Sequence, residues 1–158
     1  MLNVQRTGSP ERKELLDLAR QTGVFKPHEL AVLEEVLDEY LRRQDASGYR
    51  CYTARLGNEV AGFVCYGHNP VTEGTWDIYW IAVAPSCQRR GVGTALLRVA
   101  EEDIASRQGR LIVVETSSTP LYEPTRRFYE GQGYQLLAQI ADFYAPGDGL
   151  MLYGKRIA

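Results

Sequence analysis

The sequence predicts an α/β fold in which one mixed sheet carries helices on both faces. The chain has 158 residues, 44% of them hydrophobic, which suits a single domain with one core. Stretches rich in β-branched and aromatic residues alternate with stretches whose apolar residues recur at helical spacing. Their order is β-α-α-β-β-β-α-β-α-β-β, a succession typical of a sheet covered by helices. We therefore expect one domain over residues 1–158.

The amino-terminal part opens with a short strand and two helices. Leu2 to Arg6 has strand character, and Ser9-Pro10-Glu11 provides an N-cap followed by proline at the first helical position. This helix ends near Gln21, because Thr22-Gly23 interrupts the pattern. A second helix starts at Pro27-His28-Glu29. Its apolar stripe, which we assign to the core, consists of Leu30, Leu33, Val36, Leu37, Tyr40 and Leu41.

The remaining elements follow from turn residues and alternating patterns. Tyr49 to Leu56 and Glu59 to Gly67 flank Gly57-Asn58 and predict a β-hairpin. Pro124 delays the fourth helix to about Thr125. The other expected elements are a strand over residues 75–84, a helix over 91–108, a strand over 110–116, a helix over 125–132, and strands over 134–144 and 150–157.

The loop of residues 88–94, Gln88-Arg89-Arg90-Gly91-Val92-Gly93-Thr94, carries the clearest functional signal. It joins a strand to a helix, and the first N–H groups of a helix have no intrahelical partner and attract anions. Gly91 and Gly93 let the backbone approach such an anion, because they lack Cβ atoms. Arg89 and Arg90 can add charge-assisted hydrogen bonds. The pattern predicts a pyrophosphate site.

The spacing of this loop separates the known phosphate-binding motifs. Leu96 stands where a dinucleotide motif needs its third glycine, and no Gly-Lys-Ser/Thr follows. The pattern Gln/Arg-x-x-Gly-x-Gly/Ala after the strand end Ile81-Ala82-Val83-Ala84-Pro85 instead resembles the GNAT superfamily of N-acetyltransferases. The segment Phe128-Tyr129-Glu130-Gly131-Gln132-Gly133-Tyr134 is similar to that family's Phe-Tyr-Glu-x-x-Gly-Phe/Tyr motif. The resemblance covers roughly residues 49 to 157.

The resemblance implies acetyl-CoA as co-substrate, held between the strand at residues 80–84 and the strand at residues 111–116, which splay apart. It implies that the main chain of Ile81, Ala82 and Val83 binds the pantetheine amides, and that N–H groups of residues 88–94 bind the pyrophosphate, with the Thr94 hydroxyl as a further donor. The acceptor would be a primary amine on a lysine side chain, a peptide terminus or a small aliphatic molecule. Acetyl would pass to it directly in a ternary complex.

Amine acetylation needs a base, because an ammonium group of pKa near ~10 cannot attack a thioester. Asp77 aligns with the catalytic glutamate of lysine acetyltransferases in the resembled family, and its apolar neighbours favour a raised pKa. A structural acid fits Asp77 equally well, and Glu115 is the second candidate for the base. Tyr129 occupies the position from which the family protonates the CoA sulfur; packing at the helix end is the alternative.

Four further residues are candidates for the amine acceptor. Tyr79 shares a strand face with Asp77, and His28 begins the second helix, next to a loop that often contacts acceptors in the resembled family. Phe143 and Tyr144 precede the last turn. Structural or surface roles fit each of them as well. Tyr122 replaces an asparagine that contacts CoA in many members, which leaves a second hypothesis open: a module that binds acyl-CoA as a sensor without turnover.

Composition narrows the other possibilities. A net charge of −2 and a pI near 5.7 give no reason to expect a nucleic-acid partner. No apolar stretch approaches the ~20 residues of a membrane span, so we expect a soluble, cytoplasmic protein. Its three cysteines, Cys51, Cys65 and Cys87, lack Cys-x-x-Cys spacing and predict neither a disulfide framework nor a metal site. The resembled family is often dimeric, so a homodimer is also expected.

Overall fold

The computed structural model describes residues 1–158 and contains one mixed sheet of seven strands. Their order across the sheet is β1-β2-β3-β4-β5-β7-β6. Only β4 and β5 are parallel; all other neighbours are antiparallel. The strands are β1 (Leu2–Arg6), β2 (Tyr49–Leu56), β3 (Glu59–His68), β4 (Thr75–Val83), β5 (Leu111–Ser117), β6 (Gln135–Ala145) and β7 (Asp148–Arg156).

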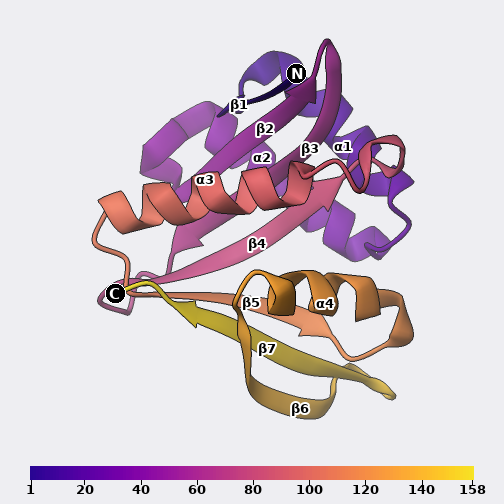
Figure 1. The fold of residues 1–158 in the computed structure, drawn as a ribbon, viewed down its shortest axis with the longest axis vertical. Helices are drawn as coiled ribbons and strands as arrows, with labels where there is room; N and C mark the ends of the chain where they lie inside the picture. The colour runs from indigo at the N-terminus through magenta and orange to yellow at the C-terminus, as the bar shows by residue number, and fades with distance from the viewer.

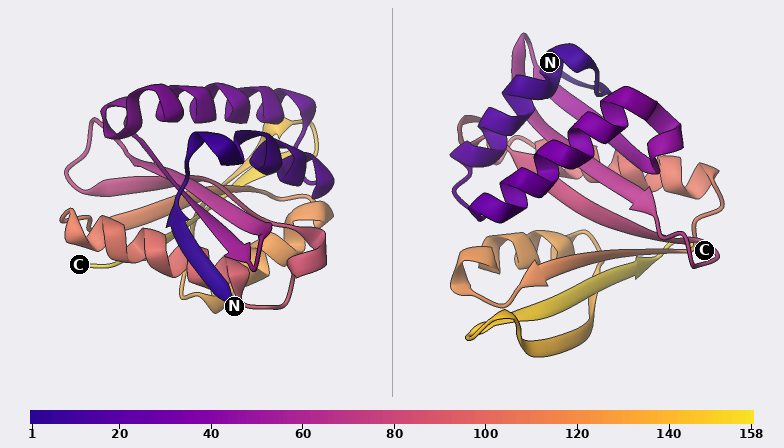
Figure 2. Two further views of the ribbon diagram at one scale, coloured as in Figure 1. Left: turned by 90° about the horizontal axis from the view of Figure 1, so that it is seen from above. Right: turned by 180° about the vertical axis from the view of Figure 1, so that it is seen from behind.

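Four α-helices cover both faces of the sheet. The left view of Figure 2 shows α1 and α2 on one side of the strands and α3 and α4 on the other. The helices are α1 (Arg12–Gln21), α2 (Pro27–Arg43), α3 (Val92–Ser106) and α4 (Glu123–Gly131). The predicted fold class and element order are confirmed.

The core lies between the sheet and its helices. The stripe predicted on the second helix packs there, because Leu33, Leu37 and Tyr40 are fully buried and Leu30 and Leu41 lie at its margin. The other face of the sheet meets the buried side of α3, whose Leu96, Leu97, Ala100 and Ile104 are inaccessible. Periodicity of 3.6 residues places such residues on one helix face, which is why the sequence pattern located both helices.

Several boundaries differ from the prediction. Ser9 does not cap the first helix: Ser9–Glu11 form a short 3-10 turn, and α1 begins at Arg12. Helix α4 begins at Glu123 rather than Thr125, with Pro124 inside its first turn, where a missing N–H costs no helical hydrogen bond. Strand β7 begins at Asp148, which pairs with Ala145, so the expected five-residue loop is the two-residue turn Pro146-Gly147. Gly147 has a φ of 79°, as the third residue of a Pro-Gly turn requires.

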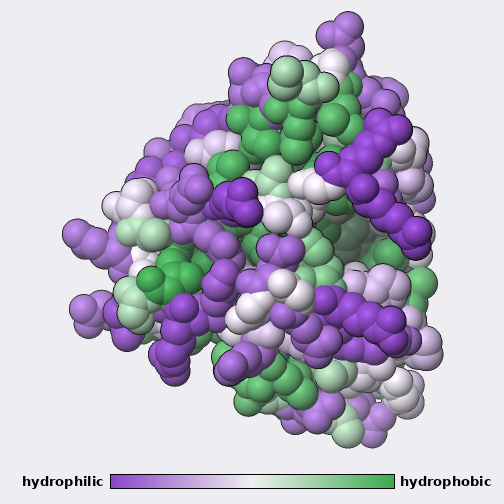
Figure 3. All heavy atoms as spheres, viewed as in Figure 1, coloured by the Kyte–Doolittle hydropathy of each residue, from purple (hydrophilic) through white to green (hydrophobic).

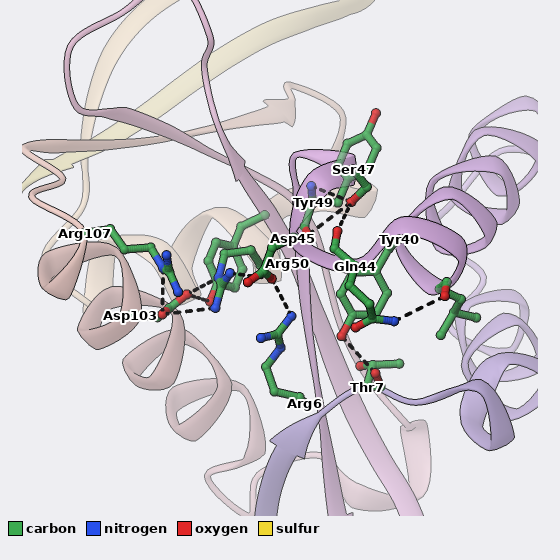
Figure 4. Close-up of polar contacts among 12 residues, drawn as sticks. Arg6, Thr7, Tyr40, Gln44, Asp45, Ser47, Tyr49, Arg50, Asp103 and Arg107 are labelled. Carbon is green, nitrogen blue, oxygen red and sulfur yellow. Dashed lines mark hydrogen bonds and ion pairs between the residues drawn. The ribbon is translucent and has the colours of Figure 1, made fainter.

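A network of charged side chains ties α3 to β2 and to the segment after α2 (Figure 4). Arg50 on β2 ion-pairs with Asp103 on α3, and its Nη1 donates to Asp45 Oδ1 at 2.7 Å. Arg6 Nη2 donates to the same Asp45 oxygen at 2.8 Å, while Arg107 Nε donates to Asp103 at 3.2 Å. The side chains of Arg50 and Asp103 are 7% and 13% exposed, so this central pair is largely removed from water, whereas Arg6, Asp45 and Arg107 lie toward the solvent. It fixes the two helical layers to the same strand.

Candidate active site

The sheet opens into a V between its two parallel strands. Strands β4 and β5 pair only from Thr75↔Leu111 to Ile78↔Val114. Beyond that pair β4 continues to Val83 and β5 to Ser117, and the two diverge (Figure 1). Residues 80–83 of β4 pair with β3 on one side and have no strand partner on the other. Their backbone polar groups along this edge are therefore free to bind an extended ligand.

A β-bulge at Tyr79 lies where the strands part. Cys65 pairs with Trp80 and Tyr66 with Ile78, so Tyr79 has no partner on β3. Bulges bend a strand and increase its twist, which accounts for the turn of β4 away from β5. Asp77 lies just before the bulge, within the paired part of the strand, and both Asp77 and Tyr79 line the same cavity.

The cavity occupies the open end of the V and has a volume of about 330 Å³. Its walls come from β4, β5, the start of α2, helix α4 with the segment that leads into it, and the ends of β6 and β7 at their turn. Viewed as in Figure 1, the molecular surface is hollowed between its upper and lower parts, and the floor of the hollow is apolar (Figure 3). A cavity of this size with a few polar groups is the usual form of a small-molecule site.

Tyr129 provides a free hydroxyl inside this cavity. Its side chain is 1% exposed, and burial, together with nearby Tyr122, raises the pKa of its phenol well above the ordinary value. The hydroxyl donates to no group of the chain, yet no fully buried polar atom in the structure lacks a partner. The oxygen must therefore open onto the cavity, which Tyr129 lines. It is a neutral proton donor without an internal acceptor.

Two carboxyl groups face the same space from neighbouring strands. Burial raises the pKa of Asp77, and the negative charge of Glu115 raises it further; Asn69 and His68 oppose the shift. Glu115 is exposed and accepts a hydrogen bond of 3.0 Å from the Tyr144 hydroxyl. A carboxyl group with a raised pKa is a stronger base than a free aspartate, so Asp77 is suited to take a proton.

The loop of residues 88–94 has the backbone of an anion-binding turn. Arg89 and Gly91 adopt left-handed φ angles of 63° and 77°. Glycine does so without cost, whereas a non-glycine residue in this region is uncommon and typical of functional loops. Helix α3 starts without a side-chain cap. The first backbone N–H of this helix that donates a hydrogen bond within the turn is that of Ala95, to Gly91 O at 3.0 Å. The N–H groups before it suit a phosphate.

Helix α4 rests directly on this loop. A Cβ on Gly93 would lie 3.2 Å from the Phe128 ring, so glycine allows the close approach of α4. Gln132 Nε2 also donates to Thr94 Oγ1 at 3.1 Å. Phe128 in turn packs edge-on against Tyr129. The anion-binding loop and the free phenol are thus held in a fixed relation by direct contacts.

The sequence matches the family model described as the acetyltransferase (GNAT) family over residues 13–134. The chain belongs to the GNAT family of acetyltransferases. A GNAT-family protein from Desulfovibrio desulfuricans is 39% identical, with a TM-score of 0.96 and 100% of each chain covered. This GNAT chain is an acyl-CoA-dependent N-acyltransferase, with acetyl-CoA as its co-substrate.

More distant structures share the fold of this GNAT protein. The ribosomal-protein-S18-alanine N-acetyltransferase of Escherichia coli is 16% identical, with a TM-score of 0.80 over 100% of this chain and 95% of its own. An aminoglycoside 6'-N-acetyltransferase in complex with coenzyme A is 20% identical, with a TM-score of 0.77 over 99% and 97% of the two chains. No protein with a curated description matches the sequence significantly.

The structure of this GNAT protein brings together most of the predicted acceptor and catalytic residues. The cavity is lined by six of them and by one predicted cofactor residue: His28, Asp77, Tyr79, Glu115, Tyr129, Tyr144 and Ile81. Phe143 is the exception among the acceptor candidates: it is 51% exposed, outside the cavity, and packs edge-on against Tyr144. Adjacent residues on a strand point to opposite faces, so only Tyr144 turns inward.

Sequence reasoning missed several residues of this GNAT cavity. Glu29 and Lys26 line it beside His28, and Tyr122 lines it from the segment before α4. Burial and the charges of Glu29 and Asp148 raise the pKa of Tyr122 to about 12. The sequence does mark Glu29 as a capping residue of α2, but this capping role gives no indication that its side chain also lines the cavity.

None of the helices has both the length and the apolar character that a membrane span requires.

Proposed function

We propose that residues 1–158 form one catalytic domain that transfers acetyl from acetyl-CoA to a primary amine by direct attack in a ternary complex. The observation that carries this proposal is the free Tyr129 hydroxyl, 1% exposed as a side chain, opening into a cavity beside an unpaired strand edge. A module that only binds acyl-CoA has no need of a proton donor at this point, so catalysis is the better supported of the two hypotheses.

Acetyl-CoA fits the groups along this side of the V. Backbone groups of Ile81, Ala82 and Val83 on the free edge of β4 would pair with the pantetheine amides, as a further strand would. The N–H groups of residues 88–94 would hold the pyrophosphate, with Arg89 and Arg90 adding charge from exposed positions. The Thr94 hydroxyl accepts a hydrogen bond from Gln132, which leaves its own proton free to be donated to the pyrophosphate.

The chain's own groups supply the proton transfers. Asp77 takes a proton from the acceptor ammonium, directly or through one water, and leaves a neutral nitrogen that forms the bond to the acetyl carbon. The carbon–sulfur bond breaks, and Tyr129 gives its proton to the sulfur; the second proton that the nitrogen loses on becoming an amide restores the phenol. Overall, an ammonium and acetyl-CoA yield an amide, CoA thiol and one proton. We assign the base to Asp77 rather than Glu115, because burial raises the pKa of Asp77 and Glu115 is exposed to solvent.

Release of CoA thiol from acetyl-CoA over a panel of amines tests this function. The panel contains polyamines, aminoglycosides, free lysine, amino-acid termini and lysine peptides, and the protein's own thiols are subtracted. We expect amine-dependent release that falls by about 10²-fold in Tyr129→Phe. Tyr134→Phe is the matched control, because Tyr134 is a buried neighbour whose hydroxyl binds Glu101 outside the cavity.

The outcomes separate the two hypotheses. Saturable acetyl-CoA binding without release for any amine would favour the sensor. Equal rates for Tyr129→Phe and Tyr134→Phe would remove Tyr129 from the mechanism, and absence of acetyl-CoA binding would contradict the co-substrate site.

We further propose that the enzyme is a cytoplasmic homodimer that pairs through β6. This strand is the sheet edge, and its side chains are exposed along almost its whole length. They include Leu136, Leu137 and Ile140, with Asp142 as the only charged residue. An apolar edge strand without lysines is suited to pair with a second copy. Light scattering should give twice the chain mass of 17.8 kDa.

A further inference from the structure

The electrostatics of the cavity carry information about the acceptor. Four carboxylate side chains line it, those of Glu29, Asp77, Glu115 and Asp148, against one lysine ammonium. That lysine, Lys26, is already engaged: its Nζ donates to Asp148 Oδ2 at 2.9 Å. Asp148 also accepts a hydrogen bond of 2.6 Å from the Ser117 hydroxyl. The Lys26–Asp148 pair is therefore neutral and internally satisfied.

None of the other three carboxylates forms a salt bridge, although the charge of Glu29 acts on Lys26 and His68 acts on Asp77. Neither Asp77 nor Glu115 forms a salt bridge, and Glu29 is bound only by the backbone N–H of Lys26, at 3.2 Å. Like charges that converge on one cavity destabilise each other; the charge of Glu115 accordingly adds to the effect of burial in raising the pKa of Asp77. A cationic ligand would relieve this repulsion.

Aromatic side chains line the cavity together with these carboxylates. Tyr144 donates to Glu115 at 3.0 Å, and burial, followed by the charges of Glu115 and Glu29, raises the pKa of its phenol. Tyr122 responds to the charge of Glu29 as well. The cavity thus has one acidic pair on the neighbouring strands β4 and β5, Asp77 and Glu115, and a separate acidic group, Glu29, at the start of α2; aromatic rings, which attract cations, line it as well.

We propose that the acceptor is an aliphatic amine with a second positive charge at its distal end and no anionic group, that is, a diamine or polyamine. This inference rests on the acetyl transfer proposed above. The attacking nitrogen lies at Asp77, the carbon chain lies along Tyr122 and Tyr144, and the distal ammonium binds near Glu29. A free amino acid or a carboxyl-terminated peptide would bring a carboxylate against unpaired acids, which is unfavourable.

Three amines of equal chain length isolate the distal group: hexamethylenediamine ends in an ammonium, hexylamine in a methyl group, and aminocaproate in a carboxylate. We expect kcat/KM for the diamine to exceed that for hexylamine by about tenfold, the value of one charge-assisted hydrogen bond, with aminocaproate the poorest. Equal values for the diamine and hexylamine, or a preference for aminocaproate, would overturn the inference while leaving the transferase activity established.

A variant assigns the distal site. Glu29→Gln should reduce the preference for the diamine over hexylamine several-fold, because only the diamine presents a distal ammonium to this carboxylate. Glutamine still fits the capping position of α2, so the helix is retained. Glu35→Gln, on an exposed part of α2 outside the cavity, is the matched control and should retain the full preference. An unchanged preference in Glu29→Gln would remove Glu29 from the distal site.

A binding measurement separates this inference from the proposed function. Calorimetric titration of the diamine and of hexylamine into the protein saturated with CoA requires no turnover. Tighter binding of the diamine without any acetyl transfer would support the acidic acceptor site and overturn the proposed reaction. Turnover of hexylamine with no selectivity in either assay would support the reaction and overturn the diamine.

Discussion

At the residue scale, Asp77 combines a chemical role with a cost to stability. Its raised pKa means that folding disfavours the ionised carboxylate. The contribution of this group to stability is therefore greatest at acidic pH and declines as the pH rises through its folded pKa. An amine-binding site requires a carboxylate of this kind, one that has no cationic partner until the substrate ammonium binds.

The variant Asp77→Asn tests both the catalytic role of this carboxylate and its cost to stability. We expect kcat to fall by about 10²-fold or more, because asparagine cannot accept the proton. The free energy of unfolding at pH 7 should stay equal or increase, because the amide carries no charge to desolvate, and the difference from the wild type should vanish at low pH. Urea unfolding at several pH values measures it. A stability loss at pH 7 would show that Asp77 is a structural acid.

The charge of Glu115 makes a separate prediction about pH dependence. Asp77 must be ionised to act, so kcat/KM should fall as the pH drops through its pKa. Glu115→Gln removes the negative charge that helps to raise this pKa, so the acidic limb of the profile should move to lower pH.

The control for this shift is Glu123→Gln, whose carboxylate pairs with Arg127 outside the cavity and should leave the limb in place. If Glu115→Gln instead abolishes activity over the whole pH range, Glu115 rather than Asp77 is the base.

At the scale of elements, Gly93 is the point at which α3 packs against α4. A Cβ at this position meets the Phe128 ring, so Gly93→Ala should displace α4 and with it Tyr129. We expect KM for acetyl-CoA to rise and kcat to fall together, since the anion-binding loop and the proton donor move as a unit. Steady-state kinetics with varied acetyl-CoA measures both.

Gly131→Ala is the matched control for this change. A Cβ on Gly131 has no neighbour within 4 Å, and the residue ends the same helix α4. The substitution should leave both kinetic constants unchanged. Equal constants for the wild type and Gly93→Ala would mean that the two helices are not mechanically coupled.

The elements differ in how far the sequence could predict them. The stripe of α2 and the Gly57-Asn58 hairpin follow from local periodicity and turn chemistry, and both are correct. The bulge at Tyr79 has no local signal, because it depends on which residues of β3 oppose β4. The place where β4 and β5 part came from the family resemblance for the same reason: strand pairing is a long-range property that a single segment does not encode.

At the scale of the whole molecule, the Arg50–Asp103 pair holds the helical layers to the sheet. Burial alone would raise the pKa of Asp103, but hydrogen bonds from Tyr66 and Arg50 outweigh it and lower the pKa below its usual value. Such a group stabilises the fold above its unfolded pKa, and the contribution is lost as the pH falls through the folded pKa.

Asp103→Asn should therefore cost about 3 kcal/mol at pH 7, because Arg50 stays buried with a weaker partner. The deficit should shrink at pH values below the ordinary carboxyl pKa of 3.8, where the wild type also loses the charge. Denaturant unfolding at pH 7 and at the acidic pH measures this difference in the free energy of unfolding. Asp17→Asn is the control, because Asp17 belongs to an exposed ion pair on α1 and its substitution should have little effect. A deficit independent of pH would point to packing instead of charge.

The short pairing between β4 and β5 divides the sheet into two parts. Only four residue pairs, Thr75↔Leu111 to Ile78↔Val114, join β1–β4 to β5–β7 along the sheet. A ligand bound between β4 and β5 would contact both parts of the sheet. If it binds the folded form alone, it raises the free energy of unfolding by about 2.7 kcal/mol at a ligand concentration of a hundred times Kd. We expect acetyl-CoA supply to govern how long this protein survives proteases as well as how fast it works, so that a cell short of acetyl-CoA would also hold less of the enzyme.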